Sequence, residues 1–282
     1  MATFKTLKQS LKGLIYKFKI DFSTKSQLPS LKTTDRTPKI IVSVTSYGRR
    51  VNSILYYTIR SILNQTIQPD RIIIWLDRDK WNDSNIPDRI SILKNNGVEI
   101  AYCKDLRSYT KLIPALKTYE EDIIITIDDD VVYPPTLIES LYNSYIKDPQ
   151  AIHCALAKSI IYENDILSSY NNWPNANHVA LNIFPLGYGG VLYPPHSLHA
   201  HTVDERKFME LCPYADDVWF YTMAKLQGTK HHFVGMNRDE YLGVDNFNQF
   251  FHKGNALAHF NVIENGNDRQ IQNIQKHYSI KF

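Results

Sequence analysis

The amino-acid sequence predicts an α/β fold, with a mostly parallel sheet that helices cover on both faces. Short runs of β-branched and other apolar residues alternate with segments of helical periodicity, and these runs are apolar on both of their faces. The chain has 282 residues, of which 43% are hydrophobic, so it can bury a large core. Ligands of such sheets bind beyond the carboxyl ends of the strands, where we expect the functional residues.

The chain begins with a basic amphipathic segment. Residues 1–34 contain seven lysines and one acidic residue, a net charge of +6, which leaves −3 for the rest of the chain. Apolar residues at helical spacing lie among these lysines: Phe4, Leu7, Leu11, Leu14, Ile15 and Phe18. Such a helix over residues 1–19 is typical of a segment that lies on an anionic membrane surface. The alternative is a helix packed on the protein's own body with its lysines in solvent.

Residues 20–38 are polar and predict a linker, so that 1–38 forms an N-terminal segment. The next part, 39–130, predicts the first half of the sheet. Its expected strands are 40–45, 71–77, 97–103 and 122–128, and its helical segments are 51–65, 86–96 and 108–119. Polar groups follow three of the strand ends: the turn Thr45–Tyr47, Asp77, and Asp128–Asp130. Three such ends at one edge of a sheet indicate a site more strongly than one acidic turn would.

The pattern loosens after residue 150. A helix is expected over 134–148, a strand over 154–164, a helix over 214–228 and a strand over 229–235, with an Asn-rich loop between 163 and 182. Between the loop and the later helix, "FPLGYGGVLYPP" places a glycine turn between two apolar runs. The tail, 236–282, is polar and is left as an unassigned C-terminal extension.

Composition excludes several classes of protein. Three widely spaced cysteines without a CxxC pair form neither a disulfide framework nor a zinc site: Cys103, Cys154 and Cys212. No apolar run is long enough to span a bilayer, and no cleavable signal sequence is visible. We therefore expect a cytoplasmic protein, peripheral on the inner face of the cell membrane. The basic segment lacks a nucleic-acid recognition motif, so a nucleic-acid partner is not expected.

The stretch "IIITIDDDVVYPP", residues 123–135, leads an apolar strand into three aspartates. Adjacent carboxylates repel one another unless a cation lies among them. A divalent metal held through Asp128 and Asp130 is one explanation, because hard cations take oxygen ligands. The other is a solvated acidic turn at a strand end.

Four stretches in order resemble the nucleotide-sugar-dependent glycosyltransferases of the GT-A fold, especially family-2-like bacterial enzymes. "IIVSVTSYGRRVNSILYYTIRSILNQTIQPDRIIIWLD" is similar to the opening strand, helix and second strand of that family, and "TIDDDVVYP" to its DxD motif. "LGYGGVLYP" looks like its glycine-rich acceptor loop, and "ADDVWFYTMAKLQG" like its xED motif. The resemblance implies a Rossmann-like GT-A catalytic domain over 39–235, with a nucleotide-binding half (39–130) and an acceptor half (131–235).

For the donor, the resemblance implies that Asp77 and the turn of Thr45, Ser46 and Tyr47 meet the base and ribose. It also implies a metal cofactor, Mn²⁺ or Mg²⁺, that bridges the diphosphate oxygens. Asp130 is the chief expected ligand, whereas Asp128 or Asp129 would bind the ribose or a metal-bound water.

Basic residues near the same edge are open to two interpretations. Lys111 either contacts the diphosphate or is an ordinary surface lysine, and Arg49 and Arg50 share that ambiguity. Many GT-A enzymes add a C-terminal histidine as a metal ligand, for which His252 and His259 are the candidates. His231 and His232 are less favoured because they lie in an expected strand.

For the acceptor, the resemblance implies a base that removes the hydroxyl proton. Asp217 matches the last acid of the xED motif, and Asp216 stands where the family usually has glutamate, so either can be the base. The alternative is an acid pair that stabilises a helix N-terminus. The acceptor loop would let the backbone approach the sugars at Gly187, Gly189 and Gly190. Its alternative is a plain hairpin turn.

These expectations describe a metal-dependent, inverting transfer of one sugar at a time to a saccharide or lipid-linked saccharide. The QxxRW motif of processive members is absent. A composition rich in Lys, Asn, Ile and Tyr is typical of an AT-rich bacterial genome, in which surface-polysaccharide synthesis is the natural setting. A metal-dependent phosphotransferase or phosphohydrolase, or a non-catalytic sugar-binding protein on the same fold, is the alternative.

Overall fold

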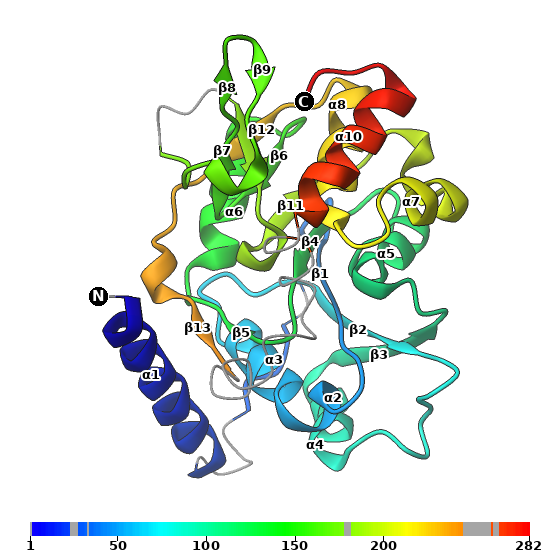
Figure 1. Ribbon diagram of the computed structural model, residues 1–282. Helices are drawn as coiled ribbons and strands as arrows, with labels where there is room; N and C mark the ends of the chain where they lie inside the picture. The colour runs from blue at the N-terminus through cyan, green and yellow to red at the C-terminus, as the bar shows by residue number, and fades with distance from the viewer. Residues whose placement is uncertain (1, 23–27, 33, 178–181, 245–260, 262–264) are drawn as a thin grey trace.

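The computed structural model describes residues 2–22, 28–32, 34–177, 182–244, 261 and 265–282, with side chains from residue 11 onward. Within these residues a central sheet of seven strands has the spatial order β12-β6-β11-β4-β1-β2-β3 (Figure 1). Its strands are β1 (Ile40–Thr45), β2 (Arg71–Asp77), β3 (Val98–Cys103), β4 (Ile123–Ile127), β6 (Ile152–Cys154), β11 (Val191–Tyr193) and β12 (His231–Phe233). The four strands expected in residues 39–130 are therefore confirmed.

The sheet is mostly parallel, as predicted. Strand β1 pairs in parallel with β2 and β4, β2 with β3, and β6 with β12. Only β11 among these strands runs the other way, between β4 and β6. In the centre, Val44 lies between Ile74 and Ile127, and β4 is buried along its whole length. Strands without a polar face require cover on both sides, which the helices supply.

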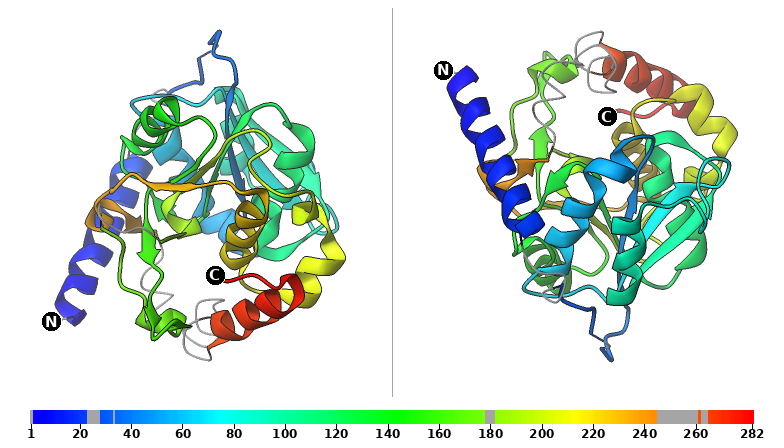
Figure 2. Two further views of the ribbon diagram at one scale, coloured as in Figure 1. Left: turned by 90° about the horizontal axis from the view of Figure 1, so that it is seen from above. Right: turned by 90° about the horizontal axis from the view of Figure 1, so that it is seen from below.

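Two helical layers cover the sheet (Figures 1 and 2). The first contains α2 (Arg50–Ser53), α3 (Leu55–Leu63), α4 (Asp88–Ser91) and α6 (Leu137–Lys147). The second contains α5 (Ile113–Thr118), α7 (Glu205–Leu211), α8 (Asp216–Gln227) and α10 (Gly266–Tyr278). The Gln65 Oε1 after α3 accepts the Ile138 amide of α6 at 3.0 Å. In the other layer, Tyr109 stacks on Phe208 with ring centroids 4.2 Å apart. Helix α10 lies in the tail that the sequence left unassigned.

Short elements complete the chain. Small strand pairs are β5 (Val131–Val132) with β13 (Leu242–Gly243), β7 (Ala157–Ser159) with β10 (Ile183–Pro185), and β8 (Tyr162–Glu163) with β9 (Ile166–Leu167). The 3₁₀ helices are η2 (Ile92–Asn96), η3 (Arg107–Lys111), η4 (Tyr170–Asn172), η5 (Gly187–Gly189), η6 (Ala200–Val203) and η7 (Arg238–Glu240). The single strand expected over 154–164 is wrong, because β6, β7 and β8 divide that stretch among three pairings. The hairpin alternative for the glycine turn is also wrong, because β10 pairs with β7 while β11 enters the central sheet.

Helix α1 (Ala2–Phe22) packs on the body through one face. A Cβ at Gly13 would lie 2.6 Å from the Gly243 oxygen of β13, and Asp21 accepts the Tyr57 hydroxyl at 2.8 Å and pairs with Arg89 at 2.5 Å. The opposite face exposes a stripe of apolar side chains: Leu11, Ile15, Phe18 and Phe22. Both views of Figure 2 place α1 and α10 on different sides of the molecule. Among the described helices, none has the length and apolarity needed to cross a membrane.

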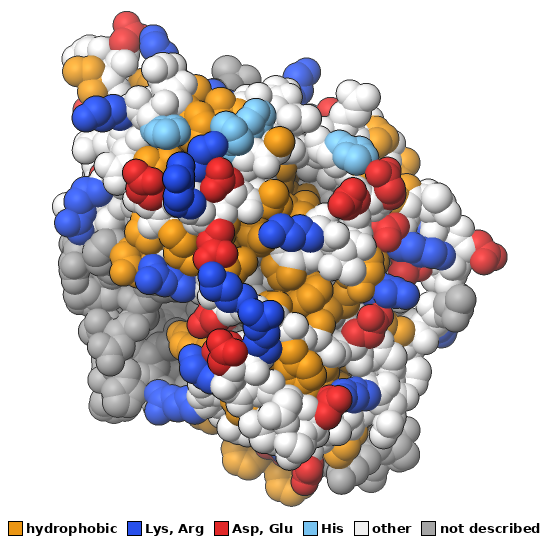
Figure 3. Space-filling model, turned by 90° about the vertical axis from the view of Figure 1, so that its right-hand side faces the viewer, with side chains coloured by type: hydrophobic (Ala, Val, Ile, Leu, Met, Phe, Trp, Pro, Cys, Tyr) orange, Lys and Arg blue, Asp and Glu red, His pale blue; other side chains and the backbone are white. Residues whose placement is uncertain are grey.

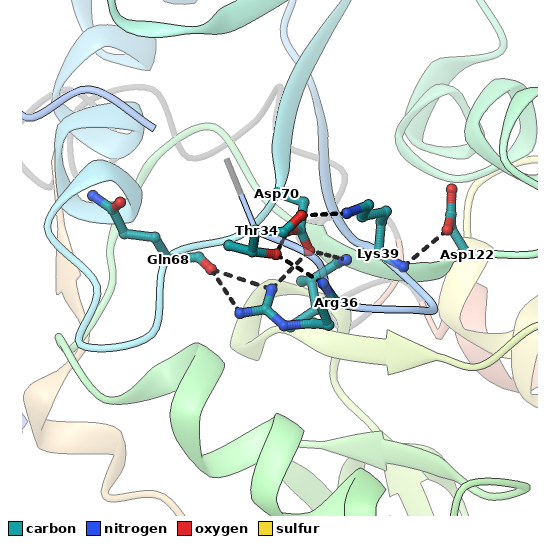
Figure 4. Close-up of polar contacts among 7 residues, drawn as sticks. Thr34, Arg36, Lys39, Gln68, Asp70 and Asp122 are labelled. Atoms are coloured by element: carbon teal, nitrogen blue, oxygen red, sulfur yellow. Dashed lines mark hydrogen bonds and ion pairs between the residues drawn. The ribbon is translucent and has the colours of Figure 1, made fainter. Parts of the chain in front are cut away.

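The described part of the segment interpreted as a linker is tied to the edge of the sheet at which β1, β2 and β4 begin (Figure 4). Asp70 accepts the Ile40 amide at 2.7 Å, pairs with Arg36 at 2.7 Å and accepts the Thr34 hydroxyl. The amide of Lys39 donates to Asp122 at 2.9 Å. These bonds set the start of β1 and therefore the position of the turn at its other end.

Candidate active site

The acidic segment 128–130 follows β4 and faces the turn after β1. Ser46 donates to Asp129 Oδ2 at 2.5 Å, and the Arg50 guanidinium bridges Asp129 Oδ1 at 2.8 Å and Asp130 Oδ2 at 3.2 Å. Burial raises the pKa of Asp129, although Arg50 and Ser46 oppose the rise. The segment is therefore not a solvated acidic turn, because a cation of the chain neutralises part of its charge.

Lys111 is buried in the same site, so the surface-lysine alternative is wrong. Its side chain is 7% exposed, and its Nζ lies 2.9 Å from Asp128 Oδ1 and 3.0 Å from Asp216 Oδ2. Burial would lower the pKa of the Lys111 ammonium, but the Asp128 and Asp216 carboxylates raise that pKa well above its ordinary value. Ser43 holds the backbone by donating to the Lys111 carbonyl at 2.6 Å. One charged lysine thus joins the acids after β4 to the acids of α8.

Asp217 lies beside Lys111 and against the glycine turn. Its Oδ2 accepts the Gly187 amide at 3.0 Å, and a Cβ at Gly187 would lie 2.3 Å from its Oδ1. Burial raises the pKa of Asp217 to about 7, Asp216 adds to the rise, and Lys111 and the Gly187 amide oppose it. A carboxyl with a pKa near neutral can accept a proton in a reaction at physiological pH.

Glycine is required in this turn by close approach as well as by conformation. A Cβ at Gly189 would lie 2.6 Å from the Leu156 Cβ, and Gly190 has a φ of +96°. Of the three predicted acceptor-loop residues, Gly187 therefore touches the base candidate, whereas Gly189 and Gly190 pack against the apolar core.

Two tyrosines that sequence reasoning missed connect these parts. The Tyr133 hydroxyl accepts the Asp128 amide at 2.9 Å and donates to the Tyr188 carbonyl at 2.9 Å. The Tyr241 hydroxyl donates to the Gly189 carbonyl at 3.0 Å. Tyr133 follows the three aspartates closely in the sequence, and that proximity could have indicated its place in the site. No neighbouring residue of Tyr241 indicates that it belongs to the site.

The remaining donor-site predictions lie at the same edge of the sheet but do not join this cluster. The Thr45 hydroxyl donates to the Trp75 carbonyl at 3.0 Å, and Asp77 pairs with Lys80 at 3.2 Å. Tyr47 is exposed, with the Arg50 guanidinium 5.1 Å from its ring centroid. These residues line the edge of the sheet beyond β1 and β2.

The histidine predictions divide in two. His252 and His259 lie outside the described residues. In β12, His232 pairs with Asp148 at 2.8 Å, and His231 stacks on Tyr221 with ring centroids 5.0 Å apart. Burial lowers the pKa of His231 to about 3. Neither of these two contacts the acidic segment.

The chemistry of the donor set fits a divalent cation, although the part of the chain that is described holds no group of three His, Cys, Asp or Glu side chains able to bind one. Mg²⁺ is commonly bound through one or two carboxylates together with substrate phosphates. Burial raises the pKa of Asp130 to about 7, against the opposing charge of Arg50 and with contributions from Asp129 and Asp128. Asp129 and Asp130 thus share the single guanidinium of Arg50, at 2.8 and 3.2 Å.

Comparisons with known proteins point to one family. The model of the family described as Glycosyl transferase family 2 matches residues 41–200, a stretch that includes the acidic segment, Lys111 and the glycine turn. No curated protein matches the chain.

Similar solved structures are remote in sequence. A 4-diphosphocytidyl-2C-methyl-D-erythritol synthase is 10% identical, with a TM-score of 0.48 over 77% of this chain and 97% of that one. A cytidylyltransferase from Leptospira borgpetersenii serovar Hardjo-bovis (strain JB197) is 14% identical, with a TM-score of 0.42 over 72% and 77%. A CMP:2-keto-3-deoxy-manno-octonic acid synthetase complexed with CTP is 12% identical, with a TM-score of 0.43 over 69% and 88%. Likenesses this distant carry no argument about what this chain binds.

Proposed function

Because the chain belongs to glycosyl transferase family 2, we propose that it moves one sugar from a nucleoside-diphosphate sugar to a saccharide or lipid-linked saccharide acceptor. The observation that carries the proposal is the junction at Lys111. Its ammonium contacts Asp128 after β4 and Asp216 at the start of α8, residues that are 88 positions apart. A site that joins the donor-side acids to the acceptor-side acids has the two halves that sugar transfer needs.

Asp217 is the proposed general base. An alcohol is a poor nucleophile until its proton is removed, and a base works best when its pKa is close to the operating pH. The pKa of Asp217 is raised to about 7, first by burial and then by Asp216. The Gly187 amide holds Oδ2 at 3.0 Å, which leaves Oδ1 to take the acceptor proton. Asp216, by contrast, is engaged with Lys111 at 3.0 Å, which favours Asp217 over Asp216 as the base.

On the donor side, Asp77 and the turn of Thr45, Ser46 and Tyr47 are proposed to bind the base and ribose. Lys111 is proposed to stabilise the negative charge of the departing diphosphate, close to Asp128. Asp130 and Asp128 would hold Mn²⁺ or Mg²⁺, which would neutralise the same charge as a Lewis acid. The direct attack of an activated hydroxyl on the anomeric carbon gives a product of inverted configuration.

We further propose that the protein works at an anionic membrane surface. The outer face of α1 exposes four apolar side chains in a stripe, and Phe22 and Phe18 are 82% and 61% exposed. Lys12 and Lys19 are exposed beside them. Apolar burial together with lysines near anionic headgroups, about 1 kcal/mol for each lysine, supports binding in the plane of the interface. There the site would meet lipid-linked acceptors of a bacterial surface polysaccharide.

A donor panel tests the activity. Purified protein is incubated with Mn²⁺ and a set of UDP-, GDP-, CDP- and TDP-sugars, and the free nucleoside diphosphate and free sugar are measured. Slow hydrolysis of one donor, abolished by chelator and by Asp130→Ala, is expected. Hydrolysis of the pyrophosphate bond instead, which yields a nucleoside monophosphate and a sugar phosphate, would identify a phosphohydrolase. Donor binding without any turnover, even with acceptors present, would identify a sugar-binding protein.

A further inference from the structure

Arg50 pairs with Asp130, the carboxylate that the sequence predicts as the chief metal ligand. Its guanidinium contacts Asp129 Oδ1 at 2.8 Å and Asp130 Oδ2 at 3.2 Å, and its side chain is 27% exposed. The residue begins α2, directly after the exposed turn that carries Tyr47. A long, partly exposed side chain that starts at a turn can move without disturbing the core.

A guanidinium and a divalent cation compete for the same oxygens. Asp130 cannot keep its contact with Arg50 and also bind a second cation there without bringing two positive charges together, which costs energy in a partly buried site. Asp129 would stay in place when Arg50 leaves, because Ser46 holds its other oxygen at 2.5 Å. The exchange therefore has to break the contact between Arg50 and Asp130, whereas Asp129 keeps Ser46 as a partner.

Lys111 lacks this freedom. It is buried, and its Nζ lies between Asp128 and Asp216 at 2.9 and 3.0 Å. Lys111 and Arg50 therefore differ in their freedom to move: the Lys111 side chain is enclosed in the protein, whereas the Arg50 side chain is partly exposed at the rim of the site.

We propose that Arg50 is an exchangeable counterion that becomes a diphosphate-binding residue. Without donor it neutralises Asp129 and Asp130. When a divalent cation binds at Asp130, Arg50 leaves that carboxylate and pairs with the diphosphate of the donor nucleotide, for which a forked guanidinium is well shaped. The inference rests on the proposed function only in requiring that the site binds a nucleoside diphosphate.

If this exchange occurs, removing Arg50 should strengthen the binding of Mn²⁺ and weaken the binding of the nucleoside diphosphate. Arg50→Gln removes the internal competitor, so Mn²⁺ alone should bind about tenfold more tightly than to the wild type. The same variant loses a contact to phosphate, so UDP, GDP or CDP, whichever the wild type prefers, should bind about tenfold more weakly at saturating Mn²⁺. Both figures correspond to one charge-assisted hydrogen bond. A residue that only supports the fold would weaken both.

The matched control is Arg49→Gln, since Arg49 is the adjacent arginine, is exposed and forms no ion pair with a described carboxylate. It should change neither constant. Mn²⁺ binding is measured by the electron paramagnetic resonance signal of the free ion, and nucleotide binding by calorimetry. If Arg50→Gln does not fold, Arg50→Lys takes its place, because a lysine keeps the charge but offers one nitrogen in place of the two guanidinium nitrogens that contact Asp129 and Asp130 separately. Its Mn²⁺ affinity should then exceed that of the wild type.

Equal or weaker Mn²⁺ binding by the variant overturns the exchange. So does a wild type that binds the nucleoside diphosphate without binding Mn²⁺, a result that leaves sugar transfer standing. Failure to bind any nucleoside diphosphate, with or without Mn²⁺, overturns the proposed function as well.

Discussion

Lys111 and Arg50 divide the acidic segment between them, and this division explains the three consecutive aspartates. Asp128 is paired with the lysine, whereas Asp129 and Asp130 are paired with the arginine. Two cations do not neutralise all the carboxylates that meet here, so burial and mutual repulsion raise the pKa of both Asp130 and Asp217 to about 7. The residual negative charge would favour a metal ion on the donor side and a proton acceptor on the other.

The first prediction at this scale concerns Asp217→Asn. It should bind the donor normally but lose transfer by on the order of 10²–10⁴-fold, the usual contribution of a general base. Asp216→Asn is the comparison, because it breaks the 3.0 Å ion pair with Lys111 and should lower the thermal unfolding temperature instead. Donor affinity, initial rates and thermal melts of both variants check this. Weaker donor binding by Asp217→Asn, or a product of retained configuration in proton NMR of the wild-type reaction, would exclude the base assignment.

A second prediction uses the contact between Gly187 and Asp217. In Gly187→Ala the new Cβ would lie 2.3 Å from Asp217 Oδ1 and 3.0 Å from Lys111 Nζ, so the variant should lose transfer and about 1–3 kcal/mol of stability. Adding Asp217→Ala should restore much of that stability while transfer stays absent. Denaturant unfolding of both single variants and of the double variant measures the coupling. Additive losses would mean that the two residues do not constrain each other.

At the scale of elements, the site is formed where the ends of distant strands and helices come together. The end of β4, the start of α8 and the glycine turn between β10 and β11 come together around Lys111 and Asp217. Asp216 and Asp217 stand in the first turn of α8, where their charge also complements the helix dipole. The structural and functional interpretations of this acid pair are therefore compatible.

A third prediction concerns the exposed apolar face of helix α1, which we expect to bind anionic membranes. Deleting the helix would uncover the body at Tyr57 and Gly243, so we change its exposed face alone. The double variant Phe18→Ser and Phe22→Ser should sediment far less with anionic liposomes at low salt and keep its activity on a soluble acceptor. Ile166→Ser is the control, because Ile166 in β9 is 72% exposed and lies outside α1. If the wild-type protein does not sediment with anionic liposomes, the exposed apolar side chains of α1 bind another partner.

At the scale of the whole molecule, charge is unevenly distributed along the chain, whereas charges of both signs are mixed on the one face that Figure 3 shows. The net charge is +3 although residues 1–34 alone carry +6. On the face in Figure 3, basic and acidic side chains alternate and form no single-sign patch.

The last prediction concerns pH and belongs to the molecule as a whole. Burial, with help from Asp216, raises the folded-state pKa of Asp217 to about 7 from 3.8. Between these values the folded state holds the proton more tightly, so the free energy of unfolding should fall as pH rises and level off above 7. Activity should change in the opposite direction, because only the ionised Asp217 accepts a proton.

Denaturant unfolding and initial rates between pH 5 and 8 measure both trends. Asp217→Asn should flatten the stability profile in part, since Asp130, whose pKa is also raised to about 7, contributes with the same sign. A stability slope that is unchanged in the variant would show that Asp217 does not titrate in this range.

Local sequence determined much of the sheet. The strands over 40–45 and 71–77 have the bounds that the sequence predicts, because each is centred on a run of apolar residues that is buried on both faces of the sheet. The acids after β4 and at α8 were identifiable from their order along the chain. The sequence also determined the basic, amphipathic character of the first helix, since that depends only on spacing.

Tertiary structure decided the rest, because it depends on contacts between distant residues. Whether Lys111 is at the surface or buried depends on residues 17 and 105 positions further along, and no local pattern records that pairing. The glycine turn resembles a hairpin locally, but β11 gains more partners by joining β4 and β6 in the central sheet. The role of Arg50 was also decided by tertiary structure. The local sequence does not distinguish Arg50 from Arg49, but folding brings Asp129 and Asp130 within 3.2 Å of the Arg50 guanidinium.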